Sequence, residues 1–384
     1  MQRQASTNQY VIRRASWLVL FLAVVLGGCV RYGFDPTDRQ EGGHEVDLID
    51  MLSDGPRADG VDGPSDGIRS DGVDGTADGV RSDAVDGLSD GIRSDGVDGP
   101  SDGVRSDAVD VLVDGSWIQT TSATTTHLSS VWGSGPDSVW AAGGNGVIVH
   151  WNGTAWSAVN SDTSNHLGAV WGSGAADVWA VGDGGRITHW NGTAWSAVTS
   201  GTSNWLNGVW GSDPNDVWAV GDGGVIVHWN GTAWTPVTSG TSVMLKGVWG
   251  AGSGDVWAVG NGGITIHWNG TVWSPVTSDT SDVLYGVWGS SSDDVWVVGE
   301  SGTIVHWNGS AWSQTSSGTT SWLYGLWGIG PNDVWAVGGP GTIVHWNGST
   351  WSETPSGNST YLWGVWGGPG GLWAVGYDGL IVHR

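Results

Sequence analysis

A Trp-Gly pair recurs seven times in the sequence, and each pair begins 39 residues after the one before it. The pairs begin at Trp132, Trp171, Trp210, Trp249, Trp288, Trp327 and Trp366. A fixed period of this length is typical of repeat architectures, because one unit of this size cannot bury its apolar face alone. The chain is therefore expected to fold as a repeat protein over this region.

Each unit of 39 residues contains four short apolar segments of strand length, which predicts four β-strands. In the first unit they cover residues 128–133, 138–143, 148–151 and 154–159. Asn152-Gly153 separates the last two segments, and an Asn-Gly pair is the strongest short signal for a hairpin with a type I′ turn. The pair recurs at Asn191, Asn230, Asn269, Asn308 and Asn347. Seven such units predict an all-β fold, a seven-bladed β-propeller with four-stranded blades of 39 residues.

The seventh unit is split between the two ends of the repeat region. It stops at Arg384, before the last Trp that the other units carry, whereas Trp117 precedes Trp132 by the same 15 residues that separate Trp156 from Trp171. Residues 114–117 are thus expected to supply the outer strand of the seventh blade. A blade built from both ends closes a ring and removes an exposed sheet edge. The predicted propeller domain spans residues 113–384, and Trp117 is the residue expected to complete it.

Residues 1–28 have the pattern of an export signal, with three Arg residues ahead of an apolar core at 17–26 that is too short to span a bilayer stably. The core ends in Leu26-Gly27-Gly28-Cys29, which resembles the lipobox of bacterial lipoproteins. The resemblance implies cleavage before Cys29 and lipid attachment to it, hence a membrane partner and a place in the cell envelope. The residue after Cys29 is Val30 and not Asp. By resemblance to the sorting rule of enteric lipoproteins, this favours the outer membrane or cell surface. The alternative is a plain secretory signal with an incidental Cys.

Residues 29–112 carry a second repeat, of period 12, which is rich in Asp and Gly. Asp59, Asp62 and Asp66 recur as Asp71, Asp74 and Asp78, and so on through Asp114. High charge with few apolar residues predicts a disordered acidic linker that holds the propeller away from the lipid. Calcium binding by this linker is the alternative, although the Asp spacing differs from known calcium loops. No other cofactor is expected.

The charge of the chain restricts its partners. The formal net charge is −25, and the basic residues after Arg105 are Arg186, Lys246 and Arg384. A protein so poor in cations cannot neutralise phosphates, so nucleic acid is not an expected partner. Cys29 is the single Cys of the sequence, which leaves no disulfide to stabilise the fold. We expect a monomer.

The run Gly-x-Ile followed by Trp-Asn-Gly-x-x-Trp resembles bacterial neuraminidase-repeat and Asp-box propellers and photosystem II assembly-factor-like repeats. The resemblance covers residues 113–384 and implies the propeller fold. It departs from the Asp-box pattern, because Trp-Asn-Gly replaces the Asp-Gly-Gly turn, so fold transfers better than activity. Sialidase chemistry needs several Arg residues, and the repeats hold Arg186 with Arg384 at their end. No side chain stands out as an activated nucleophile, so a non-enzymatic protein is predicted.

Seven repeated His residues, from His150 to His383, lie on the third predicted strands. Because these strands point outward from the axis in different blades, the seven imidazoles cannot converge on one metal ion. We expect buried, hydrogen-bonded side chains that pair with the Asp before the second Trp of the unit, as with Asp177 and Asp216. No metal site is predicted.

Positions that vary between the units are the candidates for function. Five and three residues before each Trp-Gly pair, at the end of the innermost strand, aromatic and His side chains accumulate. The predicted ligand-binding residues are His127, His166, Trp205, Tyr285, Trp322, Tyr324, Tyr361 and Trp363. Turns expected on the same side carry Asp183, Asp222, Glu300 and Asp378. These residues predict an aromatic funnel for a carbohydrate or a protein; the alternatives are packing around the axis, a polysaccharide-acting enzyme and a purely architectural protein.

Overall fold

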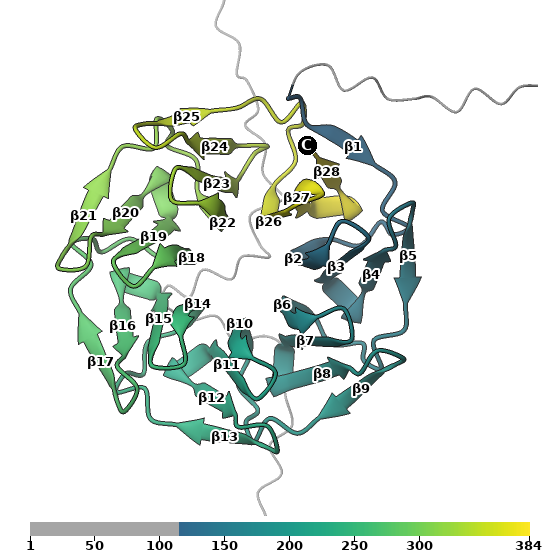
Figure 1. Cartoon of the computed structure of the whole chain (residues 1–384), viewed down its shortest axis with the longest axis horizontal. Coiled ribbons are helices and arrows are strands. Elements are labelled where there is room, and N and C mark those ends of the chain that lie inside the picture. The colour runs from purple at the N-terminus through teal and green to yellow at the C-terminus, as the bar shows by residue number, and fades with distance from the viewer. Residues whose placement is uncertain (1–114) are drawn as a thin grey trace, which may run out of the picture. The chain divides into compact units, whose positions relative to one another are not determined.

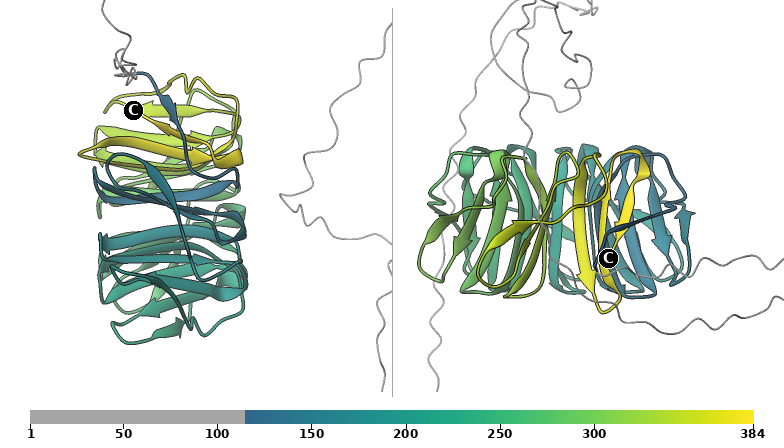
Figure 2. Two further views of the ribbon diagram at one scale, coloured as in Figure 1. Left: turned by 90° about the vertical axis from the view of Figure 1, so that its right-hand side faces the viewer. Right: turned by 90° about the horizontal axis from the view of Figure 1, so that it is seen from above.

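The structure is a computed structural model that describes residues 115–384. The predicted signal peptide (1–28), Cys29 and the predicted linker (29–112) lie outside the described residues. Seven sheets of four antiparallel strands stand around a central axis, as Figure 1 shows. This arrangement confirms the predicted seven-bladed propeller. Seen edge-on, the ring is a disc with two faces (Figure 2). Within residues 115–384, no helix is long and apolar enough to cross a membrane.

Each blade is numbered here in chain order from its innermost strand. The innermost strands are β2 (Leu128–Gly135), β6 (Leu167–Gly174), β10 (Leu206–Asp213), β14 (Leu245–Gly252), β18 (Leu284–Ser291), β22 (Leu323–Gly330) and β26 (Leu362–Gly368). The second strands are β3 (Ser138–Gly143), β7 (Asp177–Gly182), β11 (Asp216–Gly221), β15 (Asp255–Gly260), β19 (Asp294–Gly299), β23 (Asp333–Gly338) and β27 (Gly371–Gly376). The third strands are β4 (Ile148–Trp151), β8 (Arg186–Trp190), β12 (Ile226–Trp229), β16 (Thr265–Trp268), β20 (Ile304–Trp307), β24 (Ile343–Trp346) and β28 (Ile381–His383).

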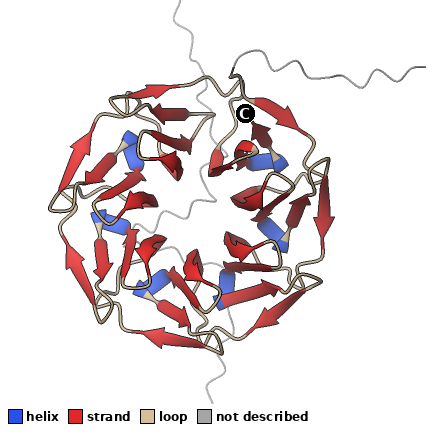
Figure 3. Ribbon diagram, viewed as in Figure 1, coloured by secondary structure: helices blue, strands red, loops and turns tan. Residues whose placement is uncertain are grey.

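The outer strands complete the blades. They are β5 (Trp156–Val159), β9 (Trp195–Val198), β13 (Trp234–Val237), β17 (Trp273–Val276), β21 (Trp312–Thr315), β25 (Trp351–Glu353) and, in blade 7, β1 (Ile118–Thr120). Short 3-10 turns, drawn in blue in Figure 3, join second and third strands. They are η1 (Gly144–Gly146), η2 (Asp183–Gly185), η3 (Asp222–Gly224), η4 (Asn261–Gly263), η5 (Glu300–Gly302) and η6 (Tyr377–Gly379).

The Asn-Gly hairpins form where the sequence predicts them, but not as type I′ turns. Trp151 pairs with Trp156 across the hairpin, so the loop has four residues. Gly153 has a φ of +91°, whereas Asn152 is absent from the residues with positive φ in the described chain. The Asn152 Oδ1 atom instead accepts hydrogen bonds from the backbone N–H groups of Thr154 and Ala155 and from the Thr154 hydroxyl, at 2.8–3.0 Å. The prediction of a type I′ turn was wrong because this side-chain cap stabilises a longer loop.

Blade 7 is closed by both ends of the described chain, as predicted. β1 pairs with β28 through Ile118 with His383, Gln119 with Val382 and Thr120 with Ile381. The strand begins after Trp117 rather than covering residues 114–117, since its first pair joins Ile118 to His383, the last residue of β28. Trp117 is buried, with its ring centroid 5.8 Å from that of Trp335 in blade 6.

Neighbouring blades are joined by clusters of aromatic rings. Trp140, on the second strand of blade 1, is 1% exposed and stacks on His150 at a centroid distance of 4.0 Å. On its other side it contacts Trp190 and Trp195 of blade 2, at 5.1 and 5.4 Å. The same four-ring arrangement recurs at the next interfaces, for example around Trp218. Each buried indole removes about 150–250 Å² of surface from water. Most of the repeated Trp residues belong to these clusters.

One interface replaces a Trp with a cation. In blade 7 the third strand ends at His383, and Arg384 occupies the position that Trp190 holds in blade 2. The Arg384 guanidinium lies 4.8 Å from the centroid of the Trp335 ring. A cation–π contact therefore completes the cluster in which Trp117 also takes part.

The repeated His residues form the predicted pairs with Asp in five blades. In blade 2, His189 Nε2 lies 2.5 Å from Asp177 Oδ1, and the equivalent distances in blades 3 to 6 are 2.6–2.8 Å. The expectation that these imidazoles are buried was wrong, because about a quarter of each side chain is exposed where the pairs reach the surface of the disc. Burial raises the pKa of Asp177, but hydrogen bonds from His189 and Ser173 outweigh it and lower that pKa.

The Gly of six of the seven Trp-Gly pairs makes room for an indole of the preceding blade, whereas a Cβ atom on Gly367 would meet Leu372 and Ile329. A Cβ atom on Gly250 would lie 2.6 Å from the Cη2 atom of Trp210 and 2.6 Å from the backbone oxygen of Asp255. Equivalent contacts place Trp132 against Gly172 and Trp366 against Gly133. The Trp-Gly pair thus reflects packing between blades. The Trp side chain projects toward the next blade, where a side chain on the facing Gly would clash with it.

Gly250→Ala is expected to destabilise the propeller by about 1–3 kcal/mol, because the new methyl group meets both an indole and backbone. Gly252→Ala is the matched control on the same strand, where a Cβ atom would meet nothing within 4 Å. Urea unfolding followed by circular dichroism measures both. Equal midpoints for the two variants would contradict the packing role given to Gly250.

Candidate functional site

One face of the disc gathers the residues that vary between blades. The loops that lead into the innermost strands and the turns between second and third strands meet there. The backbone N–H of Asp183 donates to the carbonyl of His166, and that of Tyr377 donates to the carbonyl of Tyr361, at 3.0 and 3.1 Å. The two sets of residues therefore lie side by side, as expected from the sequence. We call this side the crown face, and the side with the Asn-Gly loops the hairpin face.

The eight predicted ligand-binding residues form two groups of ring contacts on one arc around the axis. Tyr285 contacts Trp322 and Tyr324, and Tyr324 contacts Tyr361 and Trp363. At the other end of the arc His127 lies 5.1 Å from His166, which lies 5.4 Å from Trp205, measured between ring centroids. We call this set, with Tyr377, the aromatic crown.

Tyr377 is a member that the sequence analysis missed. Its ring links the two parts of the arc, with centroids 5.6 Å from Trp363 and 5.9 Å from His127. It lies in η6, at the turn position that Asp183 holds in blade 2. The signal was present in the sequence: the seventh unit reads Tyr-Asp-Gly where the second and third units read Asp-Gly-Gly.

The rings of the crown differ in their access to solvent. Tyr361 and Trp205 are 38% and 36% exposed, the largest fractions among the aromatic side chains of residues 115–384. Tyr324 is only 8% exposed, so it supports its neighbours from below. The remaining members are half-buried. The predicted set is thus mostly accessible, with Tyr324 as the packed exception.

Blades 3, 4 and 5 give the crown a charged side. Asn207 Nδ2 donates to Asp222 Oδ1 at 2.8 Å, and the Tyr285 hydroxyl donates to Glu300 Oε1 at 3.4 Å. Lys246 Nζ lies 5.8 Å from the centroid of the Tyr285 ring. Burial lowers the pKa of Lys246, while Asp222 and Glu300 partly oppose that shift. Burial, together with the neighbouring Glu300, raises the pKa of Tyr285, so its hydroxyl remains a neutral donor.

Two imidazoles occupy the crown between blades 1 and 2. His127 Nε2 lies 3.2 Å from His166 Nδ1, and the Ser129 hydroxyl lies 3.3 Å from His166 Nε2. Burial and, to a smaller extent, the neighbouring His127 lower the pKa of His166 to about 4, while Asp183 partly opposes the shift. Both rings are therefore neutral at physiological pH. Across residues 115–384, no three His, Cys, Asp or Glu side chains converge in a manner that could hold a metal ion.

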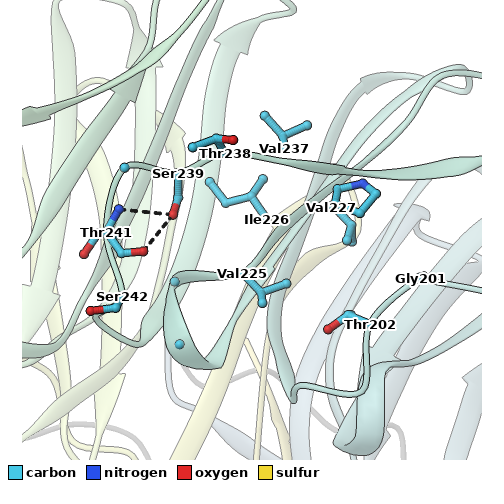
Figure 4. Close-up of a pocket in the computed structure, with 14 residues that line it drawn as sticks. Gly201, Thr202, Val225, Ile226, Val227, Val237, Thr238, Ser239, Thr241 and Ser242 are labelled. Carbon is cyan, nitrogen blue, oxygen red and sulfur yellow. Dashed lines mark hydrogen bonds between the residues drawn. The ribbon is translucent and has the colours of Figure 1, made fainter. Parts of the chain in front are cut away.

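One groove near the crown face lies away from the aromatic rings. It has a volume of about 530 Å³ and is lined by the outer strands of blade 3 and the loops beside them, including Val225, Ile226, Thr238 and Ser239 (Figure 4). Its lining contains no titratable side chain. The groove offers hydroxyl groups, such as that of Ser239, but no acid or base to activate them, so the crown is the stronger candidate for a site.

Comparison with known proteins places the fold but not the family. No family model matches the sequence, and no curated protein matches it. Solved structures do match. "YCF48 bound to D1 peptide" is 18% identical with a TM-score of 0.60, over 71% of this chain and 96% of that one. YCF48 from Cyanidioschyzon merolae is 17% identical with a TM-score of 0.58, over 70% and 98%. The WD40 β-propeller domain of Doa1 is 12% identical with a TM-score of 0.60, over 69% and 94%.

These structures share the propeller fold with this chain. At such identities the likeness concerns the fold alone. They support the propeller fold that the sequence resemblance implies. The lipoprotein anchor at Cys29 stays a prediction.

The low pKa of His166 predicts a pH-dependent stability. Between about pH 6.5 and 4 the unfolded chain takes up a proton at this residue and the folded chain does not, so the free energy of unfolding falls as pH falls through this window. Above pH 6.5 the contribution is absent. NMR titration of the imidazole should give a midpoint near 4, and His166→Gln should weaken the loss of stability on acidification. A midpoint near 6.5 would show that the ring is not desolvated.

Proposed function

We propose that this chain is a non-enzymatic binding propeller, anchored in the cell envelope through lipid on Cys29, whose aromatic crown binds a carbohydrate or a protein. The observation that carries the proposal is the crown itself. Nine rings that break the 39-residue repeat lie in one arc on one face, and two of them are more than a third exposed. Clustered exposed aromatics mark contact surfaces in soluble proteins.

The positions of the two Arg residues within residues 115–384 support a binding role over catalysis. The Arg186 side chain donates to the backbone oxygen of Asp162, and Arg384 packs on Trp335 in the ring closure. Neither is placed to clamp an anionic substrate at the crown. The polar groups that do line the crown are already paired: Asn207 donates to Asp222, and Glu300 accepts from the Tyr285 hydroxyl.

The similar solved structures supply a precedent for a protein ligand. One of them, by its description, is a propeller bound to a peptide. Flat aromatic rings suit either class of ligand, since they stack on sugar rings and pack on peptide side chains. The Asp- and Gly-rich linker would let the crown reach ligands away from the membrane, over a distance on the order of 50 Å for a flexible coil of that length.

A binding experiment with the full chain in detergent tests the crown. Trp205→Ala and Trp322→Ala, which remove rings on opposite parts of the arc, should each weaken capture of a glycan-array ligand or a pulled-down protein at least tenfold, since truncating a buried interface aromatic typically costs about 2 kcal/mol or more. Val272→Ala is the control, because it trims an exposed apolar side chain on the hairpin face. Identical ligands and affinities for all variants would refute the proposal, and so would turnover of a glycan by the wild type.

The anchor has its own test. In cells fed labelled palmitate, the wild type should incorporate label into the envelope fraction, and Cys29→Ala should not. Retention of label in that variant, or secretion of unlabelled wild type into the medium, would contradict lipid attachment at Cys29.

A further inference from the structure

Three crown rings of blade 7 form an open box. The rings of Tyr361 and Trp363 are nearly parallel, with an interplanar angle of 24° and centroids 6.4 Å apart. The Tyr377 ring is close to perpendicular to both, at 80° and 78°, with centroid distances of 5.8 and 5.6 Å. We call these three residues the blade 7 cage. A small group seated against them would lie within about 6 Å of all three centroids, the range over which a cation is attracted by a ring.

A second set of crown rings has the same geometry and already faces a cation. Tyr285 and Trp322 are nearly parallel, with an angle of 27° and centroids 6.2 Å apart, and Tyr324 lies at 67° to each. The chain's own Lys246 lies over the Tyr285 ring. Within residues 115–384, cation–π contacts occur at Tyr285 and at Trp335, and none occurs at the blade 7 cage.

The charge around the blade 7 cage suits a cation. Asp378, exposed in η6, adjoins Tyr377 and contributes to the raised pKa of its hydroxyl, after burial and Tyr361. The nearest imidazole, His127, has a pKa lowered by burial and is neutral at physiological pH. Lys246 belongs to the other set, where Asp222 and Glu300 act on it. The cage thus combines three π faces with a carboxylate, and no positive charge of the crown adjoins it.

We infer that the blade 7 cage binds an alkylammonium group, carried as a lysine or N-methylated lysine side chain by a protein ligand. The inference rests on the proposed function and specifies the ligand class. Rings set perpendicular to one another favour a compact cation, since a sugar needs one flat, open ring face. The acidic residues of the crown face add a favourable long-range attraction for a basic segment.

The cage depends on a small residue in the neighbouring blade. A Cβ atom on Gly339 would lie 2.3 Å from the Cδ1 and Cε1 atoms of Tyr361, so this ring rests directly on the Gly339 backbone. Other blades carry Asp183 and Asp222 at the same turn position. Gly339→Asp is therefore compatible with the turn but must displace Tyr361. Gly339 is a positioning residue for the cage.

Titrations of the full chain with choline and its neutral isostere, in which a tert-butyl group replaces trimethylammonium, test the charge requirement by saturation-transfer NMR. The wild type should bind choline and bind the isostere at least fivefold more weakly. Tyr361→Ala, Trp363→Ala and Gly339→Asp should each weaken choline binding about three- to tenfold, which is the loss of one cation–π contact. Val272→Ala should leave it unchanged, and urea midpoints identify any variant that fails to fold.

Short peptides distinguish a protein ligand from a free small molecule. Peptides with a central lysine or trimethyllysine should bind more tightly than choline, and the matching glutamine peptide should not bind. Equal affinity for choline and its isostere would overturn the inference, as would unchanged binding by Tyr361→Ala. Choline binding without lysine-peptide binding would refute the protein source of the cation. If crown variants lose a natural partner while neither cation binds, the proposed function stands and this inference fails.

Discussion

The contact of one indole with two indoles of the next blade is the interaction on which the ring depends. Trp140 and its equivalents carry it from blade to blade, backed by a stacked imidazole on the other side. Residues 115–384 contain no Cys, so these ring contacts stabilise the domain where many small extracellular domains rely on disulfides. The rest of the repeat follows from them: Gly after Trp leaves room, and the Asp that pairs with the imidazole fixes its orientation.

A framework repeated so strictly leaves the innermost strand ends free to vary. Leu128 and its equivalents stay fixed and fully buried, while the residues on either side of them vary between blades. This division explains why comparison between units of a single chain could locate the crown. Side chains can change there without disturbing the contacts that hold the blades together.

The ring count, the strand order and the split seventh blade were predictable, because each rests on a period that a sequence displays directly. Eight crown residues were predictable for the same reason. Tyr377 was missed: the sequence shows an aromatic residue at that turn, but its contacts with His127 and Trp363 depend on which loops the ring brings together. The capping of the hairpin loop by Asn152 and the packing of Arg384 on Trp335 were not predictable either, because they depend on side-chain geometry that spacing does not encode. The acidic surroundings of Lys246 became visible only when three blades were placed side by side.

The closure of blade 7 gives the propeller a mechanical weak point. A pull applied through the chain ahead of residue 115 acts first on β1, which is held by three residue pairs with β28. Peeling this strand would open the blade whose innermost strand carries Trp363 and whose η6 carries Tyr377. Trp117 directly precedes β1 and packs edge-on against Trp335, so this contact would break before the strand separates. β1 thus belongs to the same four-stranded sheet as β26 and β27, which flank the blade 7 residues of the crown, so a pull on β1 would act on the sheet that supports them.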